Sequence, residues 1–95
     1  MVIAMSEARR IGVIVRERQR EGLRMAVGLT VLDDAVEVYL MDRPLQGGPE
    51  VEQYVEALGL MGATVATNLP DGAFPCLTDA EAAHALAQCD VVIPY

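Results

Sequence analysis

The segment Arg10-Ile11-Gly12-Val13-Ile14-Val15 decides the fold class of this 95-residue chain. Its apolar residues are mostly β-branched and follow one another without polar alternation, a pattern that predicts a strand buried on both faces. Strands of this kind belong to parallel sheets that are covered by helices on both sides. We therefore expect a small α/β fold.

Helical and strand-like patterns alternate along the rest of the chain. The expected helices span residues 19–32, 49–61 and 79–88, and the further expected strands span residues 35–41, 63–67 and 90–94. Pro49 suits the first turn of the middle helix, and Gly62 suits its C-terminal cap. Alternation at this spacing implies right-handed crossovers, so the four strands should form a mainly parallel sheet within a three-layer sandwich.

For this sheet we expect the strand order 2-1-3-4, which reverses between the first and the third strand. Ligands of open α/β sheets bind beyond the carboxyl ends of the strands at such a reversal. The crevice expected there is lined by residues 16–19 and residues 68–76. Arg16, Arg18 and Asn68 are therefore the candidate ligand-binding residues.

The composition favours a single domain, residues 1–95, that associates with other subunits. Hydrophobic residues make up 53% of the chain, and residues 1–9 read as an N-terminal tail. In the first expected helix Leu23, Ala26, Val27, Thr30 and Val31 form the buried stripe. Met25, Leu29 and Leu32 lie off that stripe. A second apolar face of a helix is usually covered too, so we expect a subunit contact through the C-terminal half of this helix.

The charge distribution limits the classes of partner. The net charge is −7, and a broad basic surface for phosphate binding is missing, so we expect no nucleic-acid partner. All seven basic residues are arginines, and six of them fall within the first 24 positions. This cluster can hold an anionic ligand; alternatively, its members pair with Glu17 and Glu21 on a solvated helix start.

No apolar run approaches the roughly 18 residues needed to span a bilayer. The apolar stretch of residues 1–5 is also too short for a secretory signal. We expect a cytoplasmic protein without a membrane partner.

Cys76 is the candidate catalytic residue. It stands two residues ahead of Thr78-Asp79-Ala80-Glu81, a T-x-x-E capping box that predicts the start of a helix. Free backbone N–H groups and the positive end of the helix dipole stabilise a thiolate at such a position. The alternative is that Cys76 is an ordinary small residue of a loop or core.

Other chemistries lack their motifs. No glycine-rich phosphate-binding sequence follows the first strand, and Ser6 is the only serine. His84 has no partners at metal-ligand spacing, so we expect a surface or interface histidine, and we expect no metal and no cofactor. Cys89 lies at the far end of the helix that Cys76 precedes, about 15 Å away and beyond disulfide reach, and is best interpreted as a small core residue.

Four segments together resemble small proteins of the DsrE/DsrF/DsrH-like superfamily. They are residues 11–15 (I-G-V-I-V), 21–29 (E-G-L-R-M-A-V-G-L), 36–41 (V-E-V-Y-L-M) and 89–95 (C-D-V-V-I-P-Y). The resemblance implies a compact α/β fold that assembles into homo- or hetero-oligomers, often trimers or hexamers. Some members accept persulfide sulfur from a donor protein, in sulfur oxidation or tRNA thiolation, on a cysteine that closely follows a strand and opens a helix. Others lack that cysteine and are structural partners.

The function expected from this resemblance is sulfur relay through Cys76, between a sulfur donor and a sulfur acceptor protein. Here the loop of residues 68–75 separates the cysteine from the preceding strand. Leu69, Phe74 and Leu77 can form an apolar rim for partner docking. Two alternatives stay open: a non-catalytic oligomeric subunit, and a binder of a small anionic ligand at the crevice.

Overall fold

A computed structural model of the chain describes residues 9–32, 35–70 and 73–95. The elements in chain order are β1 (Arg10–Val15), α1 (Gln19–Thr30), β2 (Ala35–Leu40), α2 (Pro49–Leu60), β3 (Thr64–Thr67), α3 (Asp79–Ala87) and β4 (Val91–Pro94). Each expected helix and strand is confirmed, with ends that differ by at most two residues. The expected N-terminal tail lies outside the described residues except for Arg9.

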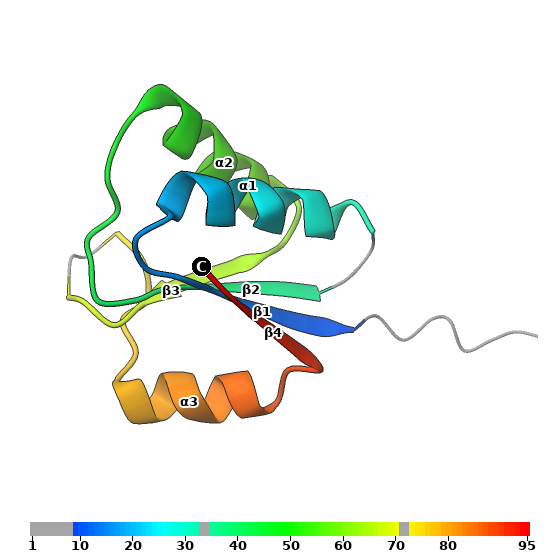
Figure 1. Cartoon of the computed structure of the whole chain (residues 1–95), viewed down its shortest axis with the longest axis vertical. Coiled ribbons are helices and arrows are strands. Elements are labelled where there is room, and N and C mark those ends of the chain that lie inside the picture. The colour runs from blue at the N-terminus through cyan, green and yellow to red at the C-terminus, as the bar shows by residue number, and fades with distance from the viewer. Residues whose placement is uncertain (1–8, 33–34, 71–72) are drawn as a thin grey trace, which may run out of the picture.

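The four strands are all parallel, in the order β3-β2-β1-β4 (Figure 1). The predicted order 2-1-3-4 is therefore wrong. The two central strands have six residues each, whereas the edge strands β3 and β4 have four each. Short strands suit the edges of a sheet because they leave few backbone groups unpaired. The reversal of strand order consequently falls between β1 and β4.

Helices cover both faces of the sheet, as the three-layer prediction requires. Figure 1 shows α1 and α2 on one face and α3 on the other. Alternate side chains of the central strands point to opposite faces. The larger core lies under α1 and α2 and contains Ile11, Val13, Val15, Leu23, Ala26, Val36, Val38, Leu40, Val51 and Leu58. The smaller core lies under α3 and is built on Tyr39, Met41 and Ala82.

Gly12 lets α3 approach β1 closely. A Cβ atom at this position would lie 2.7 Å from Leu86 Cδ2 and 3.1 Å from Cys89 Sγ. Real Cβ atoms are essentially never found at the shorter of these separations. The distance between the sheet and α3 therefore depends on the missing side chain.

The end of α1 differs from the predicted helix. Val31 was expected in the buried stripe, yet 68% of it is exposed because α1 ends at Thr30. Leu29, expected off the stripe, packs against the larger core. Met25 accepts a hydrogen bond from the Tyr95 hydroxyl at 3.1 Å, so it faces its own chain. Of the residues expected to form a second apolar face, only Leu32 is largely exposed, at 67%.

Among the described residues, no helix combines the length and the apolar character that crossing a membrane requires.

Candidate functional site

Four polar side chains form a connected network at the carboxyl ends of β1, β2 and β3. Arg16 Nε donates to Asp42 Oδ2 at 3.0 Å. Asn68 Nδ2 donates to Asp42 Oδ1 at 2.9 Å and to Asp79 Oδ1 at 3.2 Å. The backbone N–H of Asp42 donates to Asn68 Oδ1 at 2.8 Å. The network thus joins the ends of three strands to the first turn of α3.

Asp42 is the centre of this network, although the sequence analysis did not select it. Its φ angle of 71° is unusual for a residue other than glycine, and aspartate is among the side chains that tolerate it best. The hydrogen bond from Asn68, followed by that from Arg16, lowers the pKa of Asp42 below its ordinary value. Its position two residues beyond β2 was the available signal, because such positions meet the ends of neighbouring parallel strands.

The structure therefore brings Arg16 and Asn68 together, but only through Asp42. The Asn68 amide accepts one hydrogen bond and donates two within the protein. It acts here as a positioning side chain that links β2, β3 and α3. Arg16 has a half-exposed side chain whose charge is paired with Asp42.

Arg18 lies apart from this network and packs over the ring of Tyr95. Tyr95 follows β4, beside the point where the strand order reverses between β1 and β4. The guanidinium carbon of Arg18 is 5.3 Å from the centroid of the Tyr95 ring, a cation–π distance. The Tyr95 carbonyl accepts from the Arg16 N–H at 2.8 Å, and a Cβ at Gly22 would lie 3.2 Å from Tyr95 Cβ. Tyr95 therefore packs between the end of β4 and the start of α1.

Cys76 is exposed and lies beside the end of β3. The Thr67 N–H donates to the Pro75 carbonyl at 2.9 Å, and the Leu77 N–H donates to the Thr67 carbonyl at 2.8 Å. These two bonds form a parallel bridge between Thr67 and Cys76. The chain therefore returns to the sheet edge after leaving β3, so the cysteine lies next to the last residue of that strand.

The predicted capping box at the start of α3 is confirmed. The Glu81 N–H donates to Thr78 Oγ1 at 3.0 Å, and the Thr78 N–H donates to Glu81 Oε1 at 2.8 Å. Cys76 thus stands two residues before a well-formed helix start. The carboxylates of Asp79 and Glu81 occupy the same first turn, where they offset part of the positive charge of the helix dipole.

The apolar rim expected around Cys76 does not form one surface. Phe74 packs against the larger core, on the side of α1 and α2. Leu77 packs against the smaller core, on the side of α3. The two side chains therefore lie on opposite faces of the sheet.

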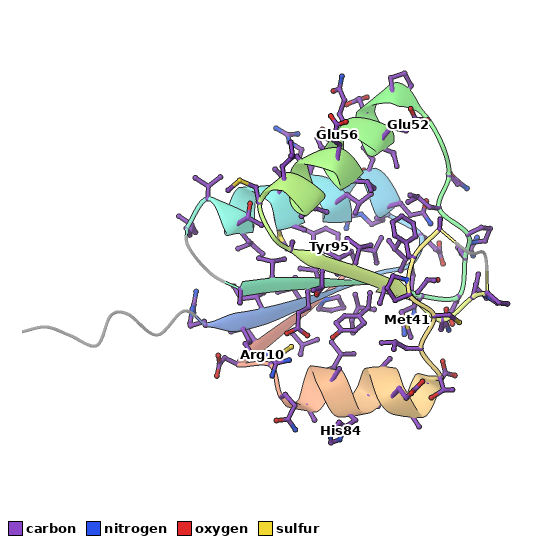
Figure 2. The ribbon with its side chains drawn as sticks, turned by 180° about the vertical axis from the view of Figure 1, so that it is seen from behind. Arg10, Met41, Glu52, Glu56, His84 and Tyr95 are labelled. Carbon is purple, nitrogen blue, oxygen red and sulfur yellow. The ribbon has the colours of Figure 1, made fainter. Side chains whose placement is uncertain are left out.

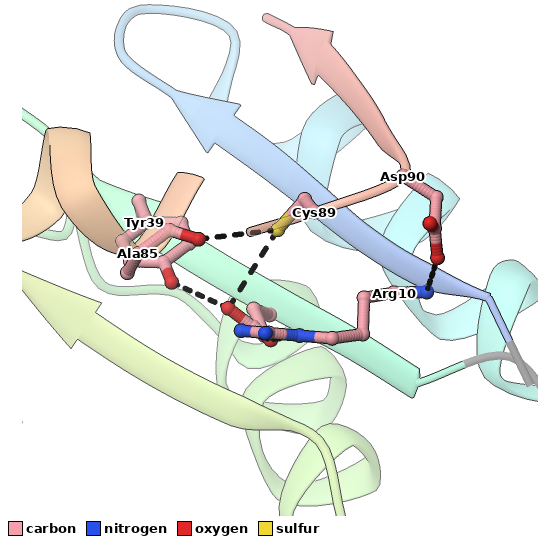
Figure 3. Close-up of polar contacts among 6 residues, drawn as sticks. Arg10, Tyr39, Ala85, Cys89 and Asp90 are labelled. Atoms are coloured by element: carbon pink, nitrogen blue, oxygen red, sulfur yellow. Dashed lines mark hydrogen bonds and ion pairs between the residues drawn. The ribbon is translucent and has the colours of Figure 1, made fainter. Parts of the chain in front are cut away.

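A second polar cluster, which the sequence analysis missed, lies under α3 (Figure 3). Glu37 accepts from Arg10 Nε at 2.8 Å and from the Tyr39 hydroxyl at 2.6 Å, and Cys89 Sγ lies 3.8 Å from Glu37 Oε1. The Asp90 carboxylate accepts from the Arg10 backbone N–H at 2.7 Å. The available signal was Glu37, a carboxylate in the middle of an otherwise apolar strand.

Burial is the main cause of the raised pKa values in this second cluster. Burial, followed by the hydrogen bond to Glu37, raises the pKa of Tyr39. Burial, followed by the charge of Glu37, also raises the pKa of the Cys89 thiol. Cys89 is thus a thiol of intermediate burial at the edge of the smaller core, rather than the buried core residue that was expected. Cys76 and Cys89 are both free, in line with the long separation expected between them.

The described residues contain no group of three or more histidine, cysteine, aspartate or glutamate side chains placed to hold a metal ion. His84 is exposed on α3, as expected (Figure 2).

The chain matches no protein-family model, no curated protein and no solved structure.

Proposed function

We propose that the protein is a sulfur carrier that accepts sulfur as a persulfide on Cys76 and passes it to a second protein. The supporting observation is the bridge that holds Cys76 beside Thr67, at the carboxyl end of β3. Despite the intervening loop, the cysteine is exposed, adjoins a strand end and precedes a capped helix. A cysteine that follows a strand and stands before a helix is also what the DsrE-like resemblance implies for a sulfur acceptor, although Cys76 follows its strand only after the loop of residues 68–75.

The transfer needs no external oxidant or reductant. The Cys76 thiol loses its proton to solvent, and the thiolate attacks the outer sulfur of a donor persulfide. The new S–S bond forms on Cys76 while the S–S bond of the donor breaks, and the donor leaves as a thiolate. Attack by an acceptor thiolate on the outer sulfur of Cys76 repeats the same exchange. Asn68 contributes by fixing the first turn of α3 through Asp79.

Mass spectrometry of the chain after incubation with polysulfide tests this proposal. We expect a gain of about 32 Da per sulfur atom, confined to the peptide that contains Cys76. Cys76→Ser should abolish the gain and leave the fold intact. Cys89→Ser is the matched control and should still load, because the Cys89 thiol is partly buried and protonated. Loading that survives Cys76→Ser would overturn the proposal.

A second candidate is a non-catalytic subunit of a homo-oligomer, such as a trimer or hexamer. Large apolar side chains remain exposed at the C-terminal ends of α1 and α2: Val31 (68%), Leu32 (67%), Leu60 (82%) and Met61 (53%). Both helices run back toward the amino ends of the strands, so these residues share one end of the α1/α2 layer. This candidate predicts a stable assembly without sulfur loading.

Binding of a small anion at the crevice has less support. Asp42 already pairs with Arg16, and Arg18 lies over the Tyr95 ring. An anion at either arginine would have to compete with these contacts.

A further inference from the structure

An apolar groove of about 550 Å³ opens beside α2, and Cys76 is not among its lining residues. The loop after β2 contributes Leu45, α2 contributes Val55, and the loop after β3 contributes Phe74. All three side chains are partly buried and pack against the larger core. The floor of the groove is therefore an extension of the protein interior that remains accessible from outside.

A buried glutamine holds one wall of this groove in place. Gln19, which is 6% exposed, donates through Nε2 to the Pro44 carbonyl at 3.1 Å. Its Oε1 accepts from the Gln46 N–H at 2.9 Å. The two bonds secure the loop on both sides of Leu45, so the wall exists before any ligand arrives. A preformed site binds more tightly because less ordering is needed on association.

Two carboxylates border the apolar floor. Glu52 and Glu56 lie one turn apart on α2, are exposed and line the groove (Figure 2). The ion pairs of the described residues engage Arg10, Arg16, Arg20 and Arg43 with other carboxylates. Glu52 and Glu56 take part in none of these pairs. Like charges four residues apart on a helix repel each other, so a cation placed near both would be favoured.

We propose that this groove docks a segment of a partner protein that presents one large apolar side chain next to lysine or arginine. The apolar side chain would occupy the floor between Leu45, Val55 and Phe74, and the cation would pair with Glu52 and Glu56. Much of the lining is open to solvent, which suits a single anchoring side chain better than an enclosed small molecule. The proposal goes beyond sulfur transfer and does not depend on Cys76.

Nuclear magnetic resonance titration of the full chain tests the docking site. The probes are short peptides in which leucine, methionine, phenylalanine, tyrosine or tryptophan is flanked by lysine and arginine, each with a matched peptide that carries glutamates instead. We expect at least one basic peptide to shift the amide signals of Leu45, Val55 and Phe74. The matched acidic peptides should leave these signals unchanged. Binding by neither set, or equal binding by both sets, would overturn the proposal.

Charge and groove variants make the test specific. The double variant Glu52→Gln/Glu56→Gln should lower the affinity for the basic peptide by about threefold to tenfold. Glu21→Gln, at an exposed glutamate of α1, is the matched control and should bind as the unaltered chain does. Ala73→Leu places a larger side chain at an exposed position of the lining and should also weaken binding. Unchanged affinity in both the double variant and Ala73→Leu would contradict the proposal, whatever the outcome of sulfur loading.

Discussion

Gly12 and Gly28 offer opposite tests of what a single methyl group does in this fold. At Gly12 an added Cβ meets Leu86 and Cys89, whereas at Gly28, an exposed position of α1, it meets nothing within 4 Å. We expect Gly12→Ala to lower the free energy of unfolding by about 1–3 kcal/mol, because α3 must move away. Gly28→Ala should raise it by about 0.5–1 kcal/mol through helix propensity. Urea unfolding measures both, and equal effects would contradict the packing described for Gly12.

The Asp42 network predicts how stability depends on pH. The hydrogen bond from Asn68, followed by that from Arg16, lowers the pKa of Asp42 in the folded state. A carboxyl group of this kind stabilises the fold above its unfolded pKa, and the stabilisation is lost as the pH falls through the folded pKa. Asn68→Ala removes the main cause. The pKa of Asp42 should therefore rise toward its ordinary value of 3.8.

Carboxyl chemical shifts followed during an acid titration measure this change. Arg16→Gln is the second variant, and we expect it to raise the pKa of Asp42 as well, because the charge of Arg16 is lost. In urea unfolding, the unaltered chain should be more stable than the Asn68→Ala variant at neutral pH. The part of this difference that comes from Asp42 ionisation should disappear when the pH falls below the folded pKa of Asp42. An Asp42 pKa that is identical in the unaltered chain and the Asn68→Ala variant would disprove the assigned cause.

At the scale of the element, the start of α3 depends on the reciprocal bonds between Thr78 and Glu81. Thr78→Ala should reduce the free energy of unfolding by about 1 kcal/mol, because a backbone donor loses its cap. Thr78→Ser keeps a hydroxyl group and should retain most of the stability. Thermal unfolding followed by circular dichroism compares the variants. Equal losses in Thr78→Ala and Thr78→Ser would show that the hydroxyl is not the stabilising group.

The elements themselves were predictable because their signals are local. Pro49 at the start of α2, Gly62 after its end and Thr78 before α3 each act within one helical turn. The end of α1 was less predictable, because the apolar stripe continues through Val31 after the helix has stopped. An apolar residue beyond a helix end carries the same sequence signal as one inside it.

At the scale of the whole molecule, the strand order could not be derived from local patterns. The residue types of the four strands do not distinguish edge from centre, and the side on which each crossover returns depends on packing between distant segments. Strand length was the useful clue, since β3 and β4 are the shorter strands and lie at the edges. The candidate site has the same limitation: Asp42 joins Arg16 and Asn68 only after three strand ends have been brought together.

The exposed apolar ends of α1 and α2 predict self-association. In sedimentation experiments the chain should have a mass well above the 10.2 kDa of one copy. Replacing Leu32 and Leu60 together with glutamate should return it toward a single copy, because charges at a buried contact are costly. Ala83→Glu, at an exposed site on α3, is the control and should leave the assembly unchanged. If the unaltered chain sediments as a single copy, self-association through the ends of α1 and α2 is excluded.

The pairing of β1 with β4 also has a consequence for how the chain acquires its structure. It joins residues that are 80 positions apart, such as Ile11 and Val91. Contacts between such distant positions slow folding, because a long stretch of chain must be ordered before they form. During synthesis on the ribosome, one backbone edge of β1 therefore has no β4 partner until residues 91–94 have emerged. Over that interval the nascent chain carries an open, apolar strand edge of the kind that promotes aggregation, and it would benefit from chaperone protection.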